Sequence, residues 1–195
     1  MTKKTPVRIL IFHMLLLTAL PAFSPTALKA QGARGGSDIR RVDFQNFTYR
    51  PSCAYDGRPV RTRKGSYVRD RGDDKLWLEV QKTAYGDLTG DRRDEAVVVT
   101  KCNTGGTGHF TEGFIYTMRK GRVSEIARLE EGDRAFGGIH DVRVERGLLV
   151  EERYAPVEPG TGACCPEYIV TTTYRLTGSG LVQVGKTKTR KFEGH

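Results

Sequence analysis

An acidic turn after Tyr85 holds the residues of this chain whose types and spacing could bind a metal ion. Counting from Asp87, oxygen-bearing side chains fall at positions one, three, five and nine, and the main-chain carbonyl at position seven can add another oxygen. The candidate ligands are Asp87, Thr89, Asp91, Arg93 through its carbonyl, and Glu95. Calcium takes about six to eight oxygen ligands at roughly 2.3–2.6 Å. Calcium binding is therefore the chemistry that this turn could support.

The same turn has a second interpretation, in which the acids only hold the backbone. Calcium loops usually place Gly at the sharp bend, where this chain has Arg92 followed by Arg93. Two cations there would repel a metal, whereas Asp87 and Asp91 can accept hydrogen bonds from nearby backbone N–H groups. We expect a structural turn that requires no cofactor, with calcium binding weak, on the order of 10⁻⁴–10⁻³ M.

A glycine-rich stretch, Asn103–His109, joins two predicted strands. It could present backbone N–H groups to an anion, or it could be a flexible hairpin connection. It lacks the Lys-Ser/Thr ending of a nucleotide-binding loop. A second polar turn, 131–138, could share a ligand rim with it. The rim candidates are Gly105, Gly106, His109, Asp133 and Arg134.

Two histidines, His109 and His140, stand in the body of the chain. Acids near them in sequence are Glu112, Asp133 and Asp141, and a histidine beside a carboxylate can serve as a general base. His140 and Asp141 are adjacent, so on a strand their side chains point to opposite faces. The chain has no G-x-S-x-G motif around a nucleophilic serine. We assign no catalytic residue from these patterns.

Four cysteines, Cys53, Cys102, Cys164 and Cys165, predict two disulfides in an exported chain. Of the three possible pairings, one joins the neighbours Cys164 and Cys165 and forces a strained peptide geometry. We expect the pairings that tie these neighbours to Cys53 and Cys102. A zinc site is the alternative, but the spacing has no C-x-x-C.

Residues 1–30 have the pattern of an export signal. Three basic residues precede an apolar run from Ile9 to Leu20, and Ala30 precedes Gln31 at the expected cleavage point. The apolar run is shorter than the ~20 residues of a membrane-spanning helix, and no cysteine near the cleavage point offers a lipid anchor. We therefore expect a secreted or periplasmic protein without a transmembrane anchor.

The charge balance is mildly basic. The net charge is +9, and removing the signal, which has four Lys or Arg and no acid, leaves +5. The basic residues concentrate in 58–71 and 186–191. These basic runs could contact the envelope or an anionic polymer, and they could equally be solvated strand faces. We expect no nucleic-acid partner for an exported protein.

Short segments of alternating apolar and polar residues, separated by turns that often contain glycine, predict an all-β domain. The predicted strands include Val42–Tyr49, a hairpin of Pro59–Arg63 with Ser66–Arg69, and one with Leu76, Leu78 and Val80 on one face. Ala96–Cys102 is apolar on both faces and is expected at the centre of a sheet. Three further hairpins are expected, at Lys120-Gly121, Arg146-Gly147 and 177–180.

About ten such strands predict a single antiparallel domain, either a sandwich or a strongly bent meander. The expected organisation is a cleaved signal peptide at 1–30, a flexible segment at 31–40, an all-β domain at 41–185 and a basic flexible tail at 186–195.

Several short motifs resemble known families. The Gly-Asp-Leu-Thr-Gly-Asp turn at 86–91 resembles the acidic loop of secreted FG-GAP and VCBS-type β-repeats. Together with Asp-Glu-Ala-Val-Val at 94–98, Gly-Asp-Arg-Ala at 132–135 and Ala-Cys-Cys-Pro at 163–166, it resembles a group of small exported bacterial proteins of unassigned function. It is more distantly similar to the LppP/LprE mycobacterial lipoproteins, but lacks their lipobox cysteine. The resemblance covers roughly 40–185 and implies no catalytic residue.

Taken together, these patterns favour an exported, disulfide-stapled β-domain that acts as a non-enzymatic binding or envelope-associated module. The partner is not specified by the sequence. The alternative is an exported hydrolase that uses His109 or His140 with a nearby carboxylate.

Overall fold

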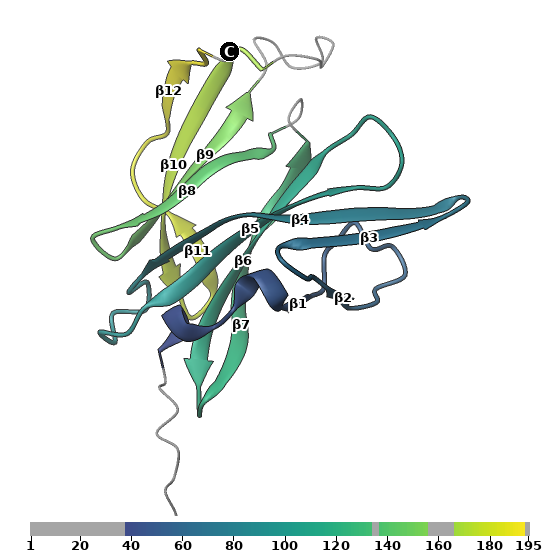
Figure 1. Cartoon of the computed structure of the whole chain (residues 1–195). Helices are drawn as coiled ribbons and strands as arrows, with labels where there is room; N and C mark the ends of the chain where they lie inside the picture. The colour runs from purple at the N-terminus through teal and green to yellow at the C-terminus, as the bar shows by residue number, and fades with distance from the viewer. Residues whose placement is uncertain (1–37, 134–136, 156–165, 194–195) are drawn as a thin grey trace, which may run out of the picture. The chain divides into compact units, whose positions relative to one another are not determined.

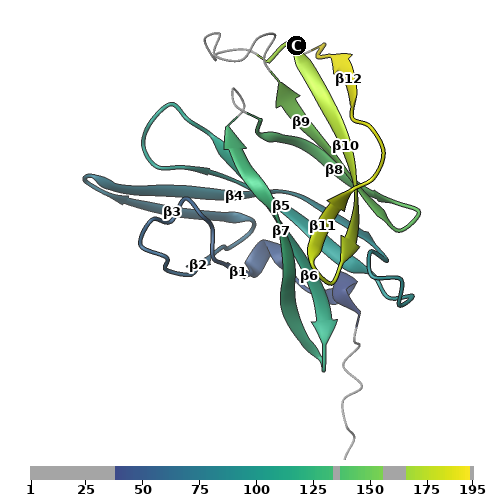
Figure 2. The same cartoon turned by 180° about the vertical axis from the view of Figure 1, so that it is seen from behind.

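The computed structural model describes residues 38–133, 137–155 and 166–193, and its longer elements are antiparallel strands (Figures 1 and 2). The first sheet has the order β3–β4–β5–β6–β7. Its strands are β3 (Ser66–Arg71), β4 (Asp74–Gly86), β5 (Glu95–Asn103), β6 (Phe110–Arg119) and β7 (Arg122–Asp133). The predicted all-β antiparallel fold class is confirmed. The expected signal peptide, Arg134, Cys164 and Cys165 lie outside the described residues.

The second sheet has the order β11–β10–β9–β8. Its strands are β8 (Ile139–Glu145), β9 (Leu148–Ala155), β10 (Tyr168–Thr177) and β11 (Gly180–Gln183), with β12 (Lys188–Lys191) also paired to β10. β12 runs antiparallel to the first residues of β10, from Tyr168 to Thr171. The structure thus places a paired strand within 186–195, where the sequence predicted a flexible tail.

The predicted hairpin turns follow from residues that adopt positive φ. Lys120-Gly121 joins β6 to β7 and Arg146-Gly147 joins β8 to β9, and all four residues have φ between 50° and 78°. Two-residue hairpin turns require this conformation. The turn at Lys64-Gly65 also forms, but only the isolated Arg63–Ser66 bridge crosses it. The predicted hairpin of Pro59–Arg63 with Ser66–Arg69 is wrong, because Val60–Arg61 pairs with Thr48–Tyr49 and β3 pairs with β4.

The segment from residue 38 to 63, called here the N-terminal segment, corrects one strand prediction. Most of Val42–Tyr49 is not a strand. Two three-residue 3-10 helices, η1 (Ile39–Arg41) and η2 (Phe44–Asn46), occupy 39–46, and only β1 (Thr48–Tyr49) pairs, with β2 (Val60–Arg61). The side chains of Asp38 and Asp43 accept hydrogen bonds from the first backbone N–H groups of each helix, which favours a turn over an extended chain. No helix within the described ranges is long and apolar enough to span a membrane.

Two apolar cores lie on opposite faces of the first sheet. The N-terminal segment covers the outer face, where Ile39, Phe44 and Tyr49 pack with strand residues such as Leu78 and Phe114. The second sheet packs on the inner face. The inner core includes Val97, Val99, Ile115, Leu129, Ile139, Val142 and Leu149. β5 is therefore buried on both faces at the centre of its sheet, as predicted for Ala96–Cys102.

The second sheet approaches the first through β8, which lies beside β4 (Figures 1 and 2). A side chain at Gly86 would overlap Val144, since its Cβ would fall 2.5 Å from a Val144 methyl carbon. Glycine at this position therefore allows the close approach of β8 to β4. The inner core occupies only part of the first sheet's inner face, and the remainder forms the candidate site.

Candidate functional site

The side chains on the inner face of the first sheet change from apolar to polar along its strands. On β5, Val97 and Val99 pack in the inner core, and the same face continues with Lys101 and Asn103. On β4, Glu79 lies opposite Lys101 and Trp77 lies opposite Asn103. Directly opposed residues in antiparallel strands point to the same side. The face therefore turns from apolar to polar and aromatic where the inner core ends.

A groove lies over this polar part of the face. It consists of two hollows of about 410 and 430 Å³ that share Lys101 and His109. The first hollow is lined by Gln81, Lys82, Val99, Lys101, His109, Thr111, Gly138, Ile139, His140, Asp141, Val142 and Tyr154. The second is lined by Trp77, Glu79, Lys101, Cys102, Asn103, Gly105, Gly106 and His109. Each volume falls in the range of small-molecule sites.

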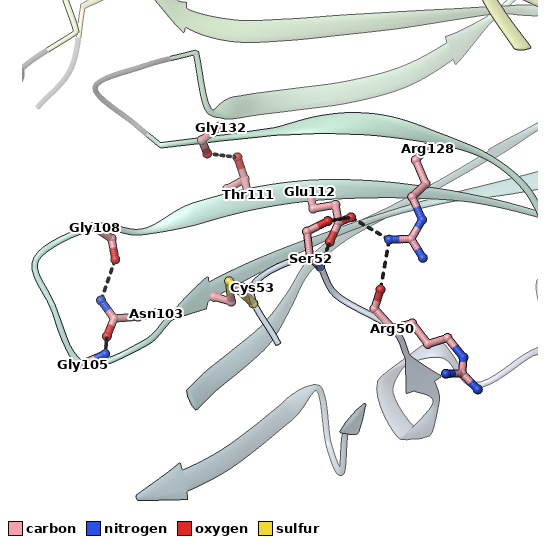
Figure 3. Close-up of a disulfide and its surroundings, with 11 residues drawn as sticks. Arg50, Ser52, Cys53, Asn103, Gly105, Gly108, Thr111, Glu112, Arg128 and Gly132 are labelled. Atoms are coloured by element: carbon pink, nitrogen blue, oxygen red, sulfur yellow. Dashed lines mark hydrogen bonds and ion pairs between the residues drawn. A yellow bond between two sulfur atoms is a disulfide. The ribbon is translucent and has the colours of Figure 1, made fainter. Parts of the chain in front are cut away.

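Thr111 joins the floor of the groove to its wall. Its hydroxyl accepts a hydrogen bond from the backbone N–H of Ile139 at 2.6 Å, at the start of β8. The same hydroxyl donates to the carbonyl of Gly132 at 3.2 Å (Figure 3). One side chain of β6 thus positions both β7 and the first residue of β8. This contact sets where the second sheet begins to cover the first.

The wall of the groove is aromatic and charged. His140 Nδ1 lies 2.9 Å from the Tyr154 hydroxyl, and the two rings meet edge to face with centroids 4.9 Å apart. Phe192 packs on both rings. Asp141 forms an ion pair with Lys82 across the groove. On the floor, Lys101 Nζ lies 3.2 Å from Glu79 Oε2. Both lysines are thus held by acids while keeping N–H donors to spare.

The glycine-rich loop at the end of the groove is held from within. The Asn103 side chain accepts a hydrogen bond from Gly105 N at 2.8 Å and donates to the carbonyl of Gly108 (Figure 3). It also donates to the carbonyl of Gly106. His109 N donates to Asp133 Oδ2 at 2.7 Å. Of the predicted rim residues, Gly105, Gly106 and His109 line the groove. The Asp133 carboxylate holds the backbone N–H of His109. Arg134 lies outside the described residues.

The predicted pairing of a histidine with a carboxylate does not appear among the described residues. His109 and His140 line one hollow although they lie on different sheets. The His140 ring contacts the Tyr154 hydroxyl instead. Glu112 takes no part in the groove. It accepts hydrogen bonds from the Ser52 backbone and hydroxyl and from Arg128 (Figure 3).

In the acidic turn, the carboxylates face hydrogen-bond donors of the protein. Asp87 accepts from Gly90 N at 2.6 Å and Arg92 N at 2.8 Å, and Asp91 accepts from Arg93 N at 2.9 Å. Glu95 is fully buried and accepts from Leu88 N and Thr89 N. Within the described part of the chain, no three acids, histidines or cysteines are grouped as metal ligands. The turn is built as the capping interpretation describes, and weak calcium binding there stays a prediction.

The disulfide pairing differs from the expectation. Cys53 bonds to Cys102, with Cα atoms 6.7 Å apart, so neither is tied to the Cys164-Cys165 pair (Figure 3). The reason lies in the contacts of Ser52, the residue before Cys53. Glu112 holds Ser52 against β6, and this brings Cys53 to the neighbouring strand end at Cys102. The disulfide therefore fastens the N-terminal segment to the central strand.

The sequence analysis did not predict several groove residues, among them Trp77, Lys82, Lys101, Thr111 and Tyr154. The alternation of apolar and polar residues could have identified Trp77. Leu76 and Leu78 are buried on the outer face, so the alternation of β4 sets Trp77 on the other face among Glu79 and Gln81. The single tryptophan of the chain on a polar strand face is typical of a contact surface.

Comparisons with known proteins give no family. No family model matches the chain, and neither a curated protein nor a solved structure matches it. The resemblances in the turn and cysteine motifs thus remain predictions, and the groove must be interpreted from its own chemistry.

Proposed function

We propose that this protein is an exported, non-enzymatic binding domain and that the groove is its ligand site. The observation that supports this is the incomplete cover of the first sheet. Strand residues that would form a core under a full second sheet are here Trp77, Lys101 and Thr111, which suit contact with a polar ligand. Export is supported by the charged and then apolar N-terminus, and mass spectrometry of the mature protein should give an N-terminus near Gln31.

The groove chemistry favours an elongated polar ligand that bears a carboxylate, such as an acidic saccharide chain. The Trp77 indole offers a flat apolar surface for a sugar ring. Lys82 and Lys101 have N–H donors beyond those facing Asp141 and Glu79, and charge-assisted hydrogen bonds to a carboxylate are the stronger kind. Two hollows in series fit a chain better than a compact molecule.

Trp77 provides a direct test, because it is the only tryptophan and lies in the groove. Titration with an oligosaccharide of uronic acids should change its fluorescence, whereas the uncharged oligosaccharide of equal length should bind at least about tenfold more weakly. Lys101→Met should weaken binding by a similar factor. Lys120→Asn, in the β6–β7 turn, removes the same charge away from the groove and should match the wild type.

Two results would overturn the proposal. One is an equal loss of binding in Lys101→Met and Lys120→Asn, since the effect would then be general electrostatic attraction. The other is saturable binding of the saccharide that leaves the Trp77 fluorescence unchanged, since the ligand would then occupy another surface.

The alternative, an exported hydrolase, is favoured by one observation: both histidines line the same hollow. General-base catalysis there would depend on His109 or His140. It is tested by ester and glycoside hydrolysis assays on the wild type, His109→Gln and His140→Phe. A rate above background that either substitution abolishes would support the enzyme, and a background rate in the wild type would contradict it.

A further inference from the structure

A hollow separate from the groove gathers four arginines. Arg40 and Arg41 come from η1, and Arg92 and Arg93 come from the turn before β5. Together with Asp38, Ile39 and Asp94 they line a space of about 380 Å³. The lining residues include four arginines and two aspartates, which gives a net charge of +2. Counting Asp91, which pairs with Arg93, lowers the net charge to +1.

Two of the four guanidinium groups are held in place. Arg40 forms an ion pair with Asp94 through Nε, and its guanidinium carbon lies 5.0 Å from the centre of the Tyr85 ring. Arg93 donates from Nε to Asp91 at 2.9 Å and forms an ion pair through Nη2. A guanidinium has five N–H donors, so both arginines keep donors that these contacts do not use. They form a preorganised frame.

The other two, Arg41 and Arg92, have no carboxylate partner among the residues that the structure describes. Arg92 is also unusual in its backbone, with φ of 65°. The other non-glycine residues with positive φ, Lys64, Lys120 and Arg146, each precede a glycine in a tight turn. Arg92 precedes Arg93 instead. A bulky residue in a conformation that suits glycine is a reason to look for a functional role.

We propose that this hollow is a binding site for a phosphate group. Two fixed guanidinium groups and two unpaired ones, contributed by separate segments, match the several oxygens of a phosphate, which arginine binds through paired hydrogen bonds. The backbone N–H of Arg92 donates to Asp87 at 2.8 Å, which sets the position of this residue in the turn. The phosphate belongs either to a small soluble compound or to an anionic lipid headgroup, and the recognition chemistry is the same.

The substitution that separates binding from folding is Arg92→Gly. It removes one unpaired guanidinium and places at that position the residue that adopts positive φ most easily. Arg41→Gln removes the other unpaired charge with little change in length. Arg146→Gly is the matched control, because it also replaces an arginine at positive φ but lies in the β8–β9 turn, outside this hollow.

Calorimetric titration with inorganic pyrophosphate tests the site, and co-sedimentation with phosphatidylglycerol vesicles distinguishes the lipid source. We expect Arg92→Gly and Arg41→Gln each to weaken pyrophosphate binding by about tenfold or more, since each loses a charge-assisted hydrogen bond. Arg146→Gly should bind as the wild type does. Vesicle binding that falls with the same two variants assigns the lipid headgroup, and absent or unchanged vesicle binding assigns the soluble compound.

The proposal is overturned if the wild type does not bind pyrophosphate, or if either Arg92→Gly or Arg41→Gln retains its affinity. It is also overturned if Arg146→Gly loses as much affinity as the other two, because the attraction would then reflect total charge. Circular dichroism of each variant at the assay temperature confirms that the loss is not one of folding.

Discussion

The Thr117 hydroxyl donates a hydrogen bond to Glu95 Oε1 at 2.7 Å, in a position where both side chains are buried. The other carboxylate oxygen, Oε2, accepts from Leu88 N at 2.9 Å and Thr89 N at 3.1 Å. Glu95 therefore links the acidic turn to the neighbouring strand β6. A residue that the sequence offered as a metal ligand works here as the internal anchor of the turn.

Replacing this anchor should destabilise the fold. Glu95→Gln leaves an amide oxygen that can still accept from Leu88 N and Thr89 N, and its N–H₂ can donate to the Thr117 hydroxyl. The hydroxyl then loses its own acceptor and the hydrogen bonds lose the carboxylate charge, so we expect a loss of about 1–3 kcal/mol. Chemical denaturation should show a loss of this size. Glu131→Gln, at an exposed position of β7, is the control and should change the unfolding free energy by less than about 0.5 kcal/mol. Equal stability of the two variants would contradict the anchoring role.

The acidic turn should fold without calcium. Thermal unfolding in EGTA should match that in plain buffer, because Asp87, Asp91 and Glu95 already accept hydrogen bonds from the protein. With a dissociation constant on the order of 10⁻⁴–10⁻³ M, about 5 mM calcium should add only ~1–2.3 kcal/mol, a rise of several degrees at most. Unfolding caused by EGTA would show that a metal is integral to the turn.

The Cys53–Cys102 bond should stabilise the protein substantially. It closes a loop with a sequence separation of 49, for which the chain-entropy model gives about 4 kcal/mol. Cys53→Ala combined with Cys102→Ala should lower the unfolding free energy by ~2–4 kcal/mol. Peptide mapping without reduction should recover the two cysteines in one linked fragment. A fragment that links either of them to Cys164 or Cys165 would contradict this pairing.

Stability should fall in acid partly because of Glu152. Burial raises the pKa of Glu152, but hydrogen bonds and charges from Arg190 and Arg143 outweigh it, so the pKa lies below its ordinary value of 4.5. The stabilisation is therefore fully present above that value and is lost as the pH falls through the lower folded-state pKa. Measured against pH, the unfolding free energy of Glu152→Gln should lack this part of the acid-induced loss. A curve parallel to that of the wild type would refute the assignment.

Arg92→Gly should not destabilise the fold. Positive φ costs a residue with a side chain about 1–2 kcal/mol, and glycine avoids this cost while losing more backbone entropy on folding. We expect the unfolding free energy to stay equal or rise by up to about 1 kcal/mol. Asp87→Ala, which removes the acceptor for Gly90 N and Arg92 N, should lower it by about 1 kcal/mol. A loss in Arg92→Gly as large as in Asp87→Ala would mean that the Arg92 side chain supports the turn.

The sequence by itself determined most of the strands and their turns. Alternation of apolar and polar residues placed β4, and an apolar run on both faces placed β5 at the centre of its sheet. Gly121 and Gly147 adopt positive φ at little steric cost, so these hairpins could be predicted. The capping by Asp87 and Asp91 is equally local. Where local signals compete, prediction failed: Asp38 and Asp43 turn the chain into η1 and η2, against the strand predicted over Val42–Tyr49.

Only the tertiary structure decided the groove, the disulfide and the arginine hollow. Each depends on residues far apart in sequence, and strand pairing within a sheet does not specify how far a second sheet covers it. The Thr111–Ile139 contact sets that limit here and leaves Trp77 and Lys101 outside the core. The Glu112 clamp on Ser52 selects Cys102 as the partner of Cys53. Such contacts depend on how side chains of distant segments pack together, and neither the composition nor the residue spacing of the sequence specifies that packing.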